Sequence, residues 1–186
     1  MGERQAVLRN HAQLTRDVRW MAARANLDVD FVVWPENATD IDPFRDAQAR
    51  SQIDEAVRAA GVPVLVGAVV DAPGDPSRVA NSGIVWDPQT GPGDRYVKRH
   101  PVPFGEYIPF GDIFPWLYSW SPYSGRFWRG ENTEPLRLNG RLLSVNICYE
   151  DIFPGHVRML MQGVRDRQVP EAMFNVAGFA DDGLVP

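Results

Sequence analysis

Apolar and polar positions along the chain predict three helices. Residues 3–25 carry apolar side chains at helical spacing. The residues that can share one apolar face of this helix are Val7, Leu14, Val18 and Met21. Residues 44–60 predict a second helix that ends at Gly61, and residues 154–163 predict a third.

Short apolar runs between and after the first two helices predict strands. Residues 30–34 form such a run, which Pro35 ends, and the Val-rich residues 62–70 form another. Residues 79–86 and 95–99 predict two further strands. Because strands and helices alternate in this half of the chain, the sequence favours an α/β layered fold.

A hairpin is the clearest feature of the second half. Residues 135–138 and 141–147 flank Asn139-Gly140, a dipeptide that is typical of two-residue hairpin turns. Residues 172–176 predict a last strand.

Turn-forming and irregular segments lie between these elements. Residues 71–78 and 87–94 are rich in Pro, Gly and Asp and predict turns. Residues 100–130 predict a long irregular segment, crowded with Pro, Gly and aromatic residues, of a length typical of binding loops.

Composition limits the classes of protein to which the chain can belong. Its 186 residues favour one domain, residues 1–186, and 44% hydrophobic with 23% charged residues is typical of a globular protein. A net charge of −5 argues against a nucleic-acid partner, which requires a basic surface. No apolar run reaches the roughly 20 residues that span a bilayer, and the N-terminus lacks the apolar stretch of a signal peptide. These patterns predict a soluble chain.

Few residues are available as metal ligands. Cys148 is the single cysteine, so the chain forms no internal disulfide and no cysteine-rich zinc site. The three histidines, His11, His100 and His156, are far apart in the sequence and match no metal-binding spacing. We therefore expect no metal site.

Three polar residues lie at or just beyond the ends of predicted strands: Glu36, Lys98 and Cys148. Such strand ends meet at one edge of an α/β sheet, where sites form. A thiol, a carboxylate and an ammonium group are what covalent acyl transfer requires, since the thiol needs a base and a cation favours the thiolate. Lys98 and the backbone N–H of Tyr149 are candidate donors to the developing oxyanion.

Each of the three residues also has an ordinary structural interpretation. A lone cysteine after an apolar run is often a small buried hydrophobe. A glutamate such as Glu36 can accept hydrogen bonds in a turn, and a lysine such as Lys98 usually lies on the surface.

The neighbouring residues favour the catalytic interpretation, because they resemble a known family. The matching blocks are Val33-Trp34-Pro35-Glu36-Asn37, Tyr96-Val97-Lys98-Arg99-His100 followed by residues 102–109 (Val-Pro-Phe-Gly-Glu-Tyr-Ile-Pro), and Ile147-Cys148-Tyr149-Glu150. In this order they resemble the nitrilase, or carbon–nitrogen hydrolase, superfamily, and more narrowly the catalytic domain of the apolipoprotein N-acyltransferases. The resemblance covers residues from about 5 to about 165 and implies an α-β-β-α sandwich.

The resemblance implies a role for each matching position. Cys148 is the expected nucleophile, Glu36 the general base, and Lys98 the group that stabilises the tetrahedral intermediate. Glu106 matches a second carboxylate that supports the lysine. Glu150 matches a further family carboxylate, although an exposed acid at a helix start is an equally good interpretation of its position.

The family's reaction implies lipid partners. A phospholipid donates an acyl chain to the cysteine, and the N-terminal amine of a diacylglyceryl lipoprotein then accepts it. The resemblance implies no cofactor. It places the parent enzyme in the cytoplasmic (inner) membrane with this domain on the periplasmic side, and membrane attachment through parts absent from this chain.

The two ends of the chain depart from the family pattern. We expect the domain to lack the family's first strand and its C-terminal portion, because after residues 171–176 the sequence from Ala177 to Pro186 does not match the family. An open sheet edge and an incomplete acyl pocket would follow.

The segment 104–128 holds 10 of the chain's 20 aromatic residues. Aromatic side chains suit a boundary between apolar and wet surroundings, so the segment is a candidate lipid or substrate loop, with Trp116, Trp120 and Tyr123 as candidate contacts. The alternative is a small satellite core beneath a long loop.

Three hypotheses about function therefore remain. The first is the catalytic domain of an apolipoprotein N-acyltransferase. The second is a soluble nitrilase-type amidase that acts on a small amide, and the third is a truncated, inactive remnant.

Overall fold

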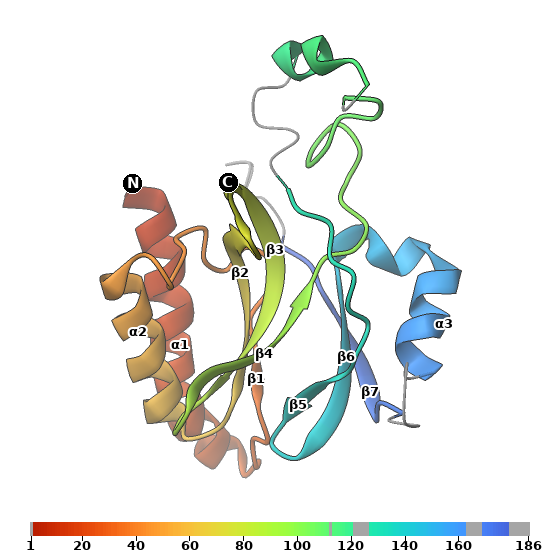
Figure 1. Cartoon of the computed structure of the whole chain (residues 1–186). Helices are drawn as coiled ribbons and strands as arrows, with labels where there is room; N and C mark the ends of the chain where they lie inside the picture. The colour runs from red at the N-terminus through yellow and green to blue at the C-terminus, as the bar shows by residue number, and fades with distance from the viewer. Residues whose placement is uncertain (1, 112, 121–126, 163–168, 179–186) are drawn as a thin grey trace, which may run out of the picture.

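Two β-sheets face each other, and helices cover their outer faces, in the computed structural model (Figure 1). The structure describes residues 2–111, 113–120, 127–162 and 169–178. Helices α1 (Gly2–Ala25) and α2 (Ala47–Ala60) lie against one sheet, and α3 (Pro154–Gln162) lies against the other. The expected α-β-β-α layers are confirmed.

Helix α1 forms where the sequence predicts it, but the predicted apolar face is wrong. The residues that α1 buries are Leu8, Ala12 and Thr15. Val7, Leu14 and Met21 remain exposed, with Leu14 60% accessible. The reason is that α1 packs on α2 through small residues. In addition, the Trp34 indole N–H donates a hydrogen bond of 2.8 Å to the Thr15 hydroxyl oxygen, which keeps Thr15 on the buried face.

Helix α2 begins and ends at recognisable caps. The Asp46 side chain accepts a hydrogen bond from the N–H of Ala49, so the helix begins three residues after the predicted Phe44. Gly61 ends it, as predicted, with a φ of 67° that favours glycine.

The first sheet has the order β1-β2-β3-β4. Its strands are β1 (Val32–Val33), β2 (Val64–Ala72), β3 (Asp75–Asp87) and β4 (Gly91–Val97). β1 pairs with β2 in parallel, and the remaining pairs are antiparallel. The predicted turns 71–78 and 87–94 are too long, because two tight hairpins extend the strands into them.

The second sheet has the order β5-β6-β7. Its strands are β5 (Leu136–Leu138), β6 (Arg141–Ile147) and β7 (Ala172–Val176). The predicted hairpin is confirmed, with Asn139 and Gly140 both at positive φ, and β7 runs parallel to β6.

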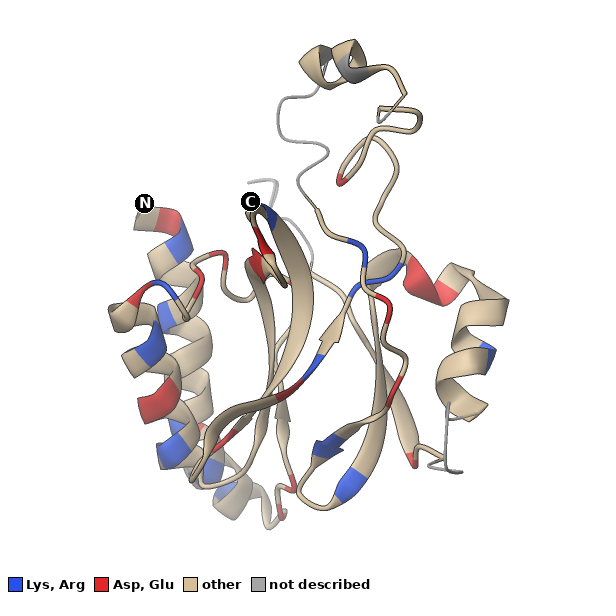
Figure 2. Cartoon of the chain, in the orientation of Figure 1, with Lys and Arg blue, Asp and Glu red and all other residues tan. Residues whose placement is uncertain are grey.

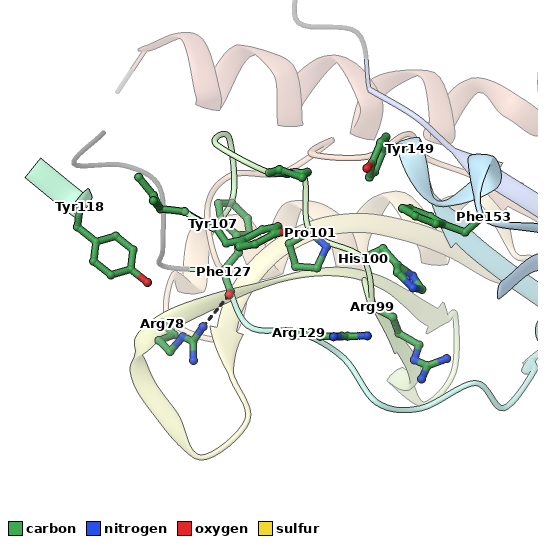
Figure 3. Close-up of a pocket in the computed structure, with 12 residues that line it drawn as sticks. Arg78, Arg99, His100, Pro101, Tyr107, Tyr118, Phe127, Arg129, Tyr149 and Phe153 are labelled. Atoms are coloured by element: carbon green, nitrogen blue, oxygen red, sulfur yellow. Dashed lines mark hydrogen bonds between the residues drawn. The ribbon is translucent and has the colours of Figure 1, made fainter. Parts of the chain in front are cut away.

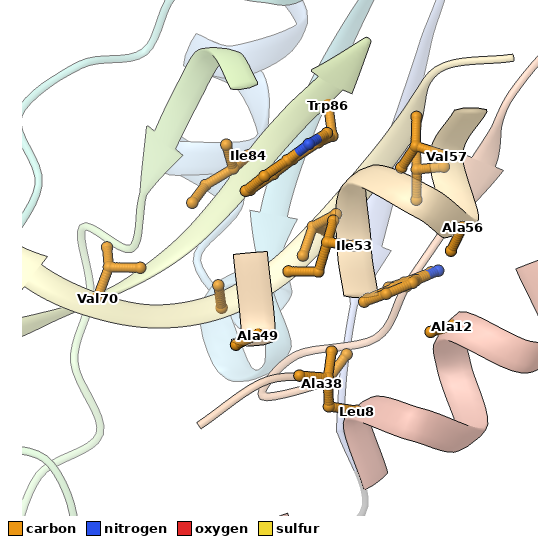
Figure 4. Close-up of a cluster of buried hydrophobic side chains, with 14 residues drawn as sticks. Leu8, Ala12, Ala38, Ala49, Ile53, Ala56, Val57, Val70, Ile84 and Trp86 are labelled. Atoms are coloured by element: carbon orange, nitrogen blue, oxygen red, sulfur yellow. The ribbon is translucent and has the colours of Figure 1, made fainter. Parts of the chain in front are cut away.

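Two hydrophobic cores hold these layers together. The first lies between the helices and the first sheet, where Trp34, Ile53 and Trp86 are buried (Figure 4). The second includes Leu65 and Val85 of the first sheet and Leu143 and Val145 of the second. Burial of apolar surface on both sides fixes the first sheet in place.

The segment 100–130, which we call the arm, projects beyond the sandwich (Figure 1). Its described residues contain the 3-10 helix η1 (Pro115–Trp120) and are otherwise irregular, as predicted. Trp116 is exposed. The side chain of Trp120 and all of Tyr123 lie outside the described residues.

Candidate active site

Three strand ends bring Glu36, Lys98 and Cys148 to one place. Glu36 follows β1, Lys98 directly follows β4, and Cys148 directly follows β6. The ammonium nitrogen of Lys98 lies 3.0 Å from an oxygen of Glu36, and the Cys148 thiol is near enough to the same carboxylate for it to raise the pKa of the thiol. The two sheets therefore each supply part of one cluster.

Lys98 is a buried cation held by two carboxylates. Its ammonium donates hydrogen bonds of 3.0 Å to Glu36 and 3.0 Å to Glu106, and only 1% of the residue is accessible. Burial opposes its charge, but the carboxylates of Glu106 and Glu36 outweigh that cost and hold the pKa of Lys98 above its usual value. Lys98 therefore stays charged, and the interpretation as a surface lysine is wrong.

Glu106 connects this cluster to the arm. One of its oxygens accepts from Lys98, and the other accepts from the backbone N–H of Val102 at 2.8 Å. The carboxylate thus holds both the cation and the first turn of the arm, as its expected supporting position requires.

Asn81 belongs to the same cluster, and the sequence analysis missed it. Its amide donates to Glu36 at 2.6 Å and lies 3.4 Å from Glu106, while its backbone oxygen accepts from the Lys98 N–H at 2.9 Å. The residue is 1% accessible. A polar Asn-Ser pair inside the otherwise apolar strand 79–86 was the available signal.

A close backbone approach fixes Glu36. The turn at Pro35-Glu36 passes so near β2 that a Cβ on Gly67 would lie 1.9 Å from the Pro35 carbonyl oxygen. Only glycine fits there without displacing the turn that carries Glu36.

Cys148 occupies a sharp turn between β6 and the 3-10 helix η2 (Cys148–Ile152). Its φ of 55° lies in the left-handed region, which is uncommon for a residue with a side chain and often marks functional sites. The backbone N–H of Tyr149 lies near enough to the sulfur to favour a lower pKa of the thiol. The strand–turn–helix arrangement presents the thiol at the sheet edge.

The thiol is not a preformed thiolate. Burial and the adjacent Glu36 carboxylate raise the pKa of Cys148, and the opposing effects of Lys98 and the Tyr149 N–H are smaller. Lys98 favours the thiolate, as expected, but burial and Glu36 outweigh its effect. A thiol beside a carboxylate instead requires proton transfer as the sulfur reacts.

Glu150 is fully buried rather than an exposed acid at a helix start. One oxygen accepts from the backbone N–H groups of Arg99 and His100, at 2.7 and 3.0 Å. The other accepts from the Ile147 N–H and the Tyr96 hydroxyl, both at 2.8 Å. Glu150 thus joins the segment after Lys98 to the residue before Cys148.

Two histidines lie beside Glu150, although they are far apart in sequence. The rings of His100 and His156 are 4.6 Å apart between centroids, and burial lowers the pKa of both. One ligand atom from each of His100, His156 and Glu150 falls within 4.8 Å of the others. The Glu150 oxygens already accept four hydrogen bonds, so this cluster serves hydrogen bonding.

A pocket of about 450 Å³ opens beside the candidate site at the base of the arm (Figure 3). Tyr149, the residue after the nucleophile candidate, forms part of its wall. The pocket combines aromatic rings with the side chains of Arg78, Arg99 and Arg129.

A family model for carbon-nitrogen hydrolases matches residues 2–165. The chain belongs to the carbon–nitrogen hydrolase family. A relative from Mycolicibacterium smegmatis, an apolipoprotein N-acyltransferase, is 39% identical over 90% of this chain. An apolipoprotein N-acyltransferase from Photobacterium profundum is 31% identical over 84% of it.

The chain spans 29% and 30% of the lengths of these two relatives. Among solved structures, an amidase from Nesterenkonia sp. superposes with a TM-score of 0.61 at 18% identity, over 96% of this chain and 61% of the amidase. This likeness supports a nitrilase-type fold for the chain. Within the described residues, no helix combines the length and apolar character needed to cross a membrane.

Proposed function

We propose that this chain belongs to the catalytic domain of an apolipoprotein N-acyltransferase. The observation that carries the proposal is the buried cluster in which Lys98 lies 3.0 Å from Glu36 and the Cys148 thiol lies beside the same carboxylate. The two relatives at 39% and 31% identity support this activity over others of the family.

The first half-reaction loads the cysteine. Glu36 takes the proton of the Cys148 thiol as the sulfur attacks the ester carbonyl carbon of a phospholipid. Lys98 and the Tyr149 N–H stabilise the oxyanion. As the C–O bond breaks, Glu36 returns the proton to the leaving glycerol oxygen, which leaves a thioester on Cys148 and a lysophospholipid.

The second half-reaction transfers the acyl chain from Cys148 to the acceptor. The N-terminal amine of a diacylglyceryl lipoprotein attacks the thioester carbonyl, Glu36 takes a proton from the amine nitrogen, and the C–S bond breaks. The thiolate then receives that proton, and the products are an amide and the free thiol. Lys98 serves both steps because its charge is retained throughout.

The arm contributes a surface suited to lipid. Phe104, Phe110 and Trp116 are 70%, 71% and 59% accessible, and such exposed aromatic groups suit the boundary of a bilayer. We assign the arm to contact with acyl chains or the membrane surface, on the periplasmic side of the cytoplasmic membrane.

Intact-protein mass spectrometry tests the proposal. The chain is mixed with phospholipid in detergent, beside Cys148→Ala and Glu36→Gln. We expect a hydroxylamine-labile acyl mass on the wild type alone. An equal acyl mass on Cys148→Ala contradicts the proposal, and rapid hydrolysis of a small amide without acylation by lipid favours an amidase instead.

A further inference from the structure

The pocket at the base of the arm is cationic, although the whole chain has a net charge of −5. Arg78 comes from β3, Arg99 follows β4, and Arg129 lies at the end of the arm. Figure 2 shows basic segments where the chain leaves β4 and where the arm returns to the sandwich. The two segments meet there, because the Gly130 N–H donates to the Lys98 carbonyl at 2.9 Å. No carboxylate lines the described part of the pocket.

The three guanidinium groups have unused donors. Within the described part of the chain, none of them forms an ion pair. Among the described residues, Arg78 donates to the Phe127 carbonyl at 3.0 Å and lies over the Trp128 ring, 5.2 Å from its centroid. Arg99 contacts the Met159 sulfur at 3.4 Å. The Nε atoms of Arg78 and Arg99 are buried without a partner.

An anion in the pocket would meet donors that no other described group uses: the buried Nε atoms of Arg78 and Arg99, and the exposed side chain of Arg129. A guanidinium group presents several N–H donors in a planar fork that matches the oxygens of a phosphate. A charge-bearing donor that is buried and unpaired costs free energy, which a bound anion removes. His100 adds no charge at neutral pH, because burial lowers its pKa.

The rest of the wall suits the remainder of a lipid. Tyr107, Phe127 and Phe153 contribute aromatic surface to the same pocket (Figure 3). Tyr149, which also lines it, is the residue after Cys148. A ligand that fits has an anionic group at one end and an apolar portion that reaches the thiol.

We propose that this pocket binds the phosphate of the phospholipid donor, through Arg99 and Arg129 with Arg78 at its edge. The inference rests on the proposed function and adds its donor specificity. Donor and acceptor both carry diacylglyceryl chains, but the donor alone carries a phosphate. A phosphate site would therefore select which lipid loads Cys148.

Direct binding tests the site without any reaction. Glycerol 3-phosphate and inorganic phosphate are titrated into the wild type and into Arg99→Gln/Arg129→Gln by calorimetry. We expect the double variant to bind glycerol 3-phosphate about tenfold more weakly or worse, as for lost charge-assisted hydrogen bonds. Arg137→Gln is the matched control, because Arg137 is exposed on β5 and outside the pocket.

Two binding results overturn the site. One is a wild type that binds neither ligand. The other is a double variant that binds as the wild type does. Tighter binding of inorganic phosphate than of glycerol 3-phosphate, without any lipid preference in the next experiment, identifies a site for a free anion and overturns the lipid assignment.

Rates of acylation of Cys148 identify the source of the phosphate. The donors are phosphatidylethanolamine, diacylglycerol with the same chains, and a p-nitrophenyl acyl ester. We expect the double variant to slow the phospholipid reaction about tenfold and leave the two phosphate-free reactions unchanged. Equal slowing with all three donors places the defect in the chemistry or the fold and overturns the inference.

The donors also separate the two proposals. A wild type that reacts with the p-nitrophenyl ester but does not prefer phospholipid over diacylglycerol overturns the phosphate site alone. A wild type that reacts with no donor contradicts the proposed function, and calorimetry then decides whether the pocket binds phosphate.

Discussion

Two buried carboxylates lie on either side of the end of β4, and they differ in what surrounds them. Glu36 contacts a cation, an amide and a thiol through Lys98, Asn81 and Cys148. Glu150 accepts four hydrogen bonds, three from backbone N–H groups and one from the Tyr96 hydroxyl. The first carboxylate lies among groups that can exchange protons, and the second among groups that hold it still.

The local charge differs as well. Around Lys98, two carboxylates face one ammonium group, so the cluster holds more negative than positive charge. Around Glu150, backbone N–H groups compensate a single charge. Glu36 therefore lies beside a group that can give up a proton, the Cys148 thiol, whereas both oxygens of Glu150 are already occupied by hydrogen-bond donors. The same residue type therefore suits a base at one position and an anchor at the other.

The largest effect is expected from Glu36→Gln. Removing a general base lowers a rate by about 10²- to 10⁴-fold, so thioester formation should almost disappear. Stability should change by less than about 1 kcal/mol, because Glu106 still compensates Lys98. Acylation rates and urea unfolding measure the two quantities. If the Glu36→Gln variant were as active as the wild type, Glu36 would not be the general base.

The opposite pattern is expected from Glu150→Gln. A glutamine places an N–H₂ group against backbone N–H donors, which leaves buried donors unpaired and costs about 3 kcal/mol. Urea unfolding should show this loss, and the acylation rate per folded molecule should fall less than in Glu36→Gln. Equal stability losses in the two variants would show that the two carboxylates do not differ as their contacts indicate.

A smaller effect is expected on the thiol of Cys148. The Glu36 carboxylate is one cause of its raised pKa, second to burial. In Glu36→Gln the pKa of the thiol should therefore fall, while burial keeps it above the ordinary value. The pH dependence of alkylation by iodoacetamide measures it, with the exposed Glu134→Gln as a control. An unshifted profile would mean that Glu36 does not interact with the sulfur.

Much of the site's location is predictable from the sequence. Strand ends carry Glu36, Lys98 and Cys148, and the rule that strand ends meet at one edge brings them together. The hairpin at Asn139-Gly140 and the helix end at Gly61 follow from local turn chemistry.

Contacts between distant segments are not predictable in this way. Asn81 joins Glu36 to Glu106 across 45 and 25 residues of sequence, and Glu150 holds Arg99 across 51. The buried face of α1 depends on how closely α2 approaches, which selects Ala12 over the larger Leu14. Such choices follow from packing between elements, and hydrophobic periodicity does not record them.

The smallest effect is expected on the pH dependence of the free energy of unfolding, through His156 beside Glu150. The groups that face His156 are Tyr96, Glu150, His100 and Arg99, and burial lowers the pKa of His156 below 6.5. Between the two pKa values the unfolded chain binds a proton that the folded chain does not, so stability rises with pH there. The contribution is complete above about pH 7 and is lost as the pH falls through about 6 towards the folded pKa. The free energy of unfolding, measured in urea at a series of pH values, should fall less steeply with decreasing pH in His156→Gln than in the wild type. His100 still titrates in both proteins, so a smaller slope remains in the variant. An unchanged slope would mean that the folded chain protonates His156 as readily as the unfolded chain does.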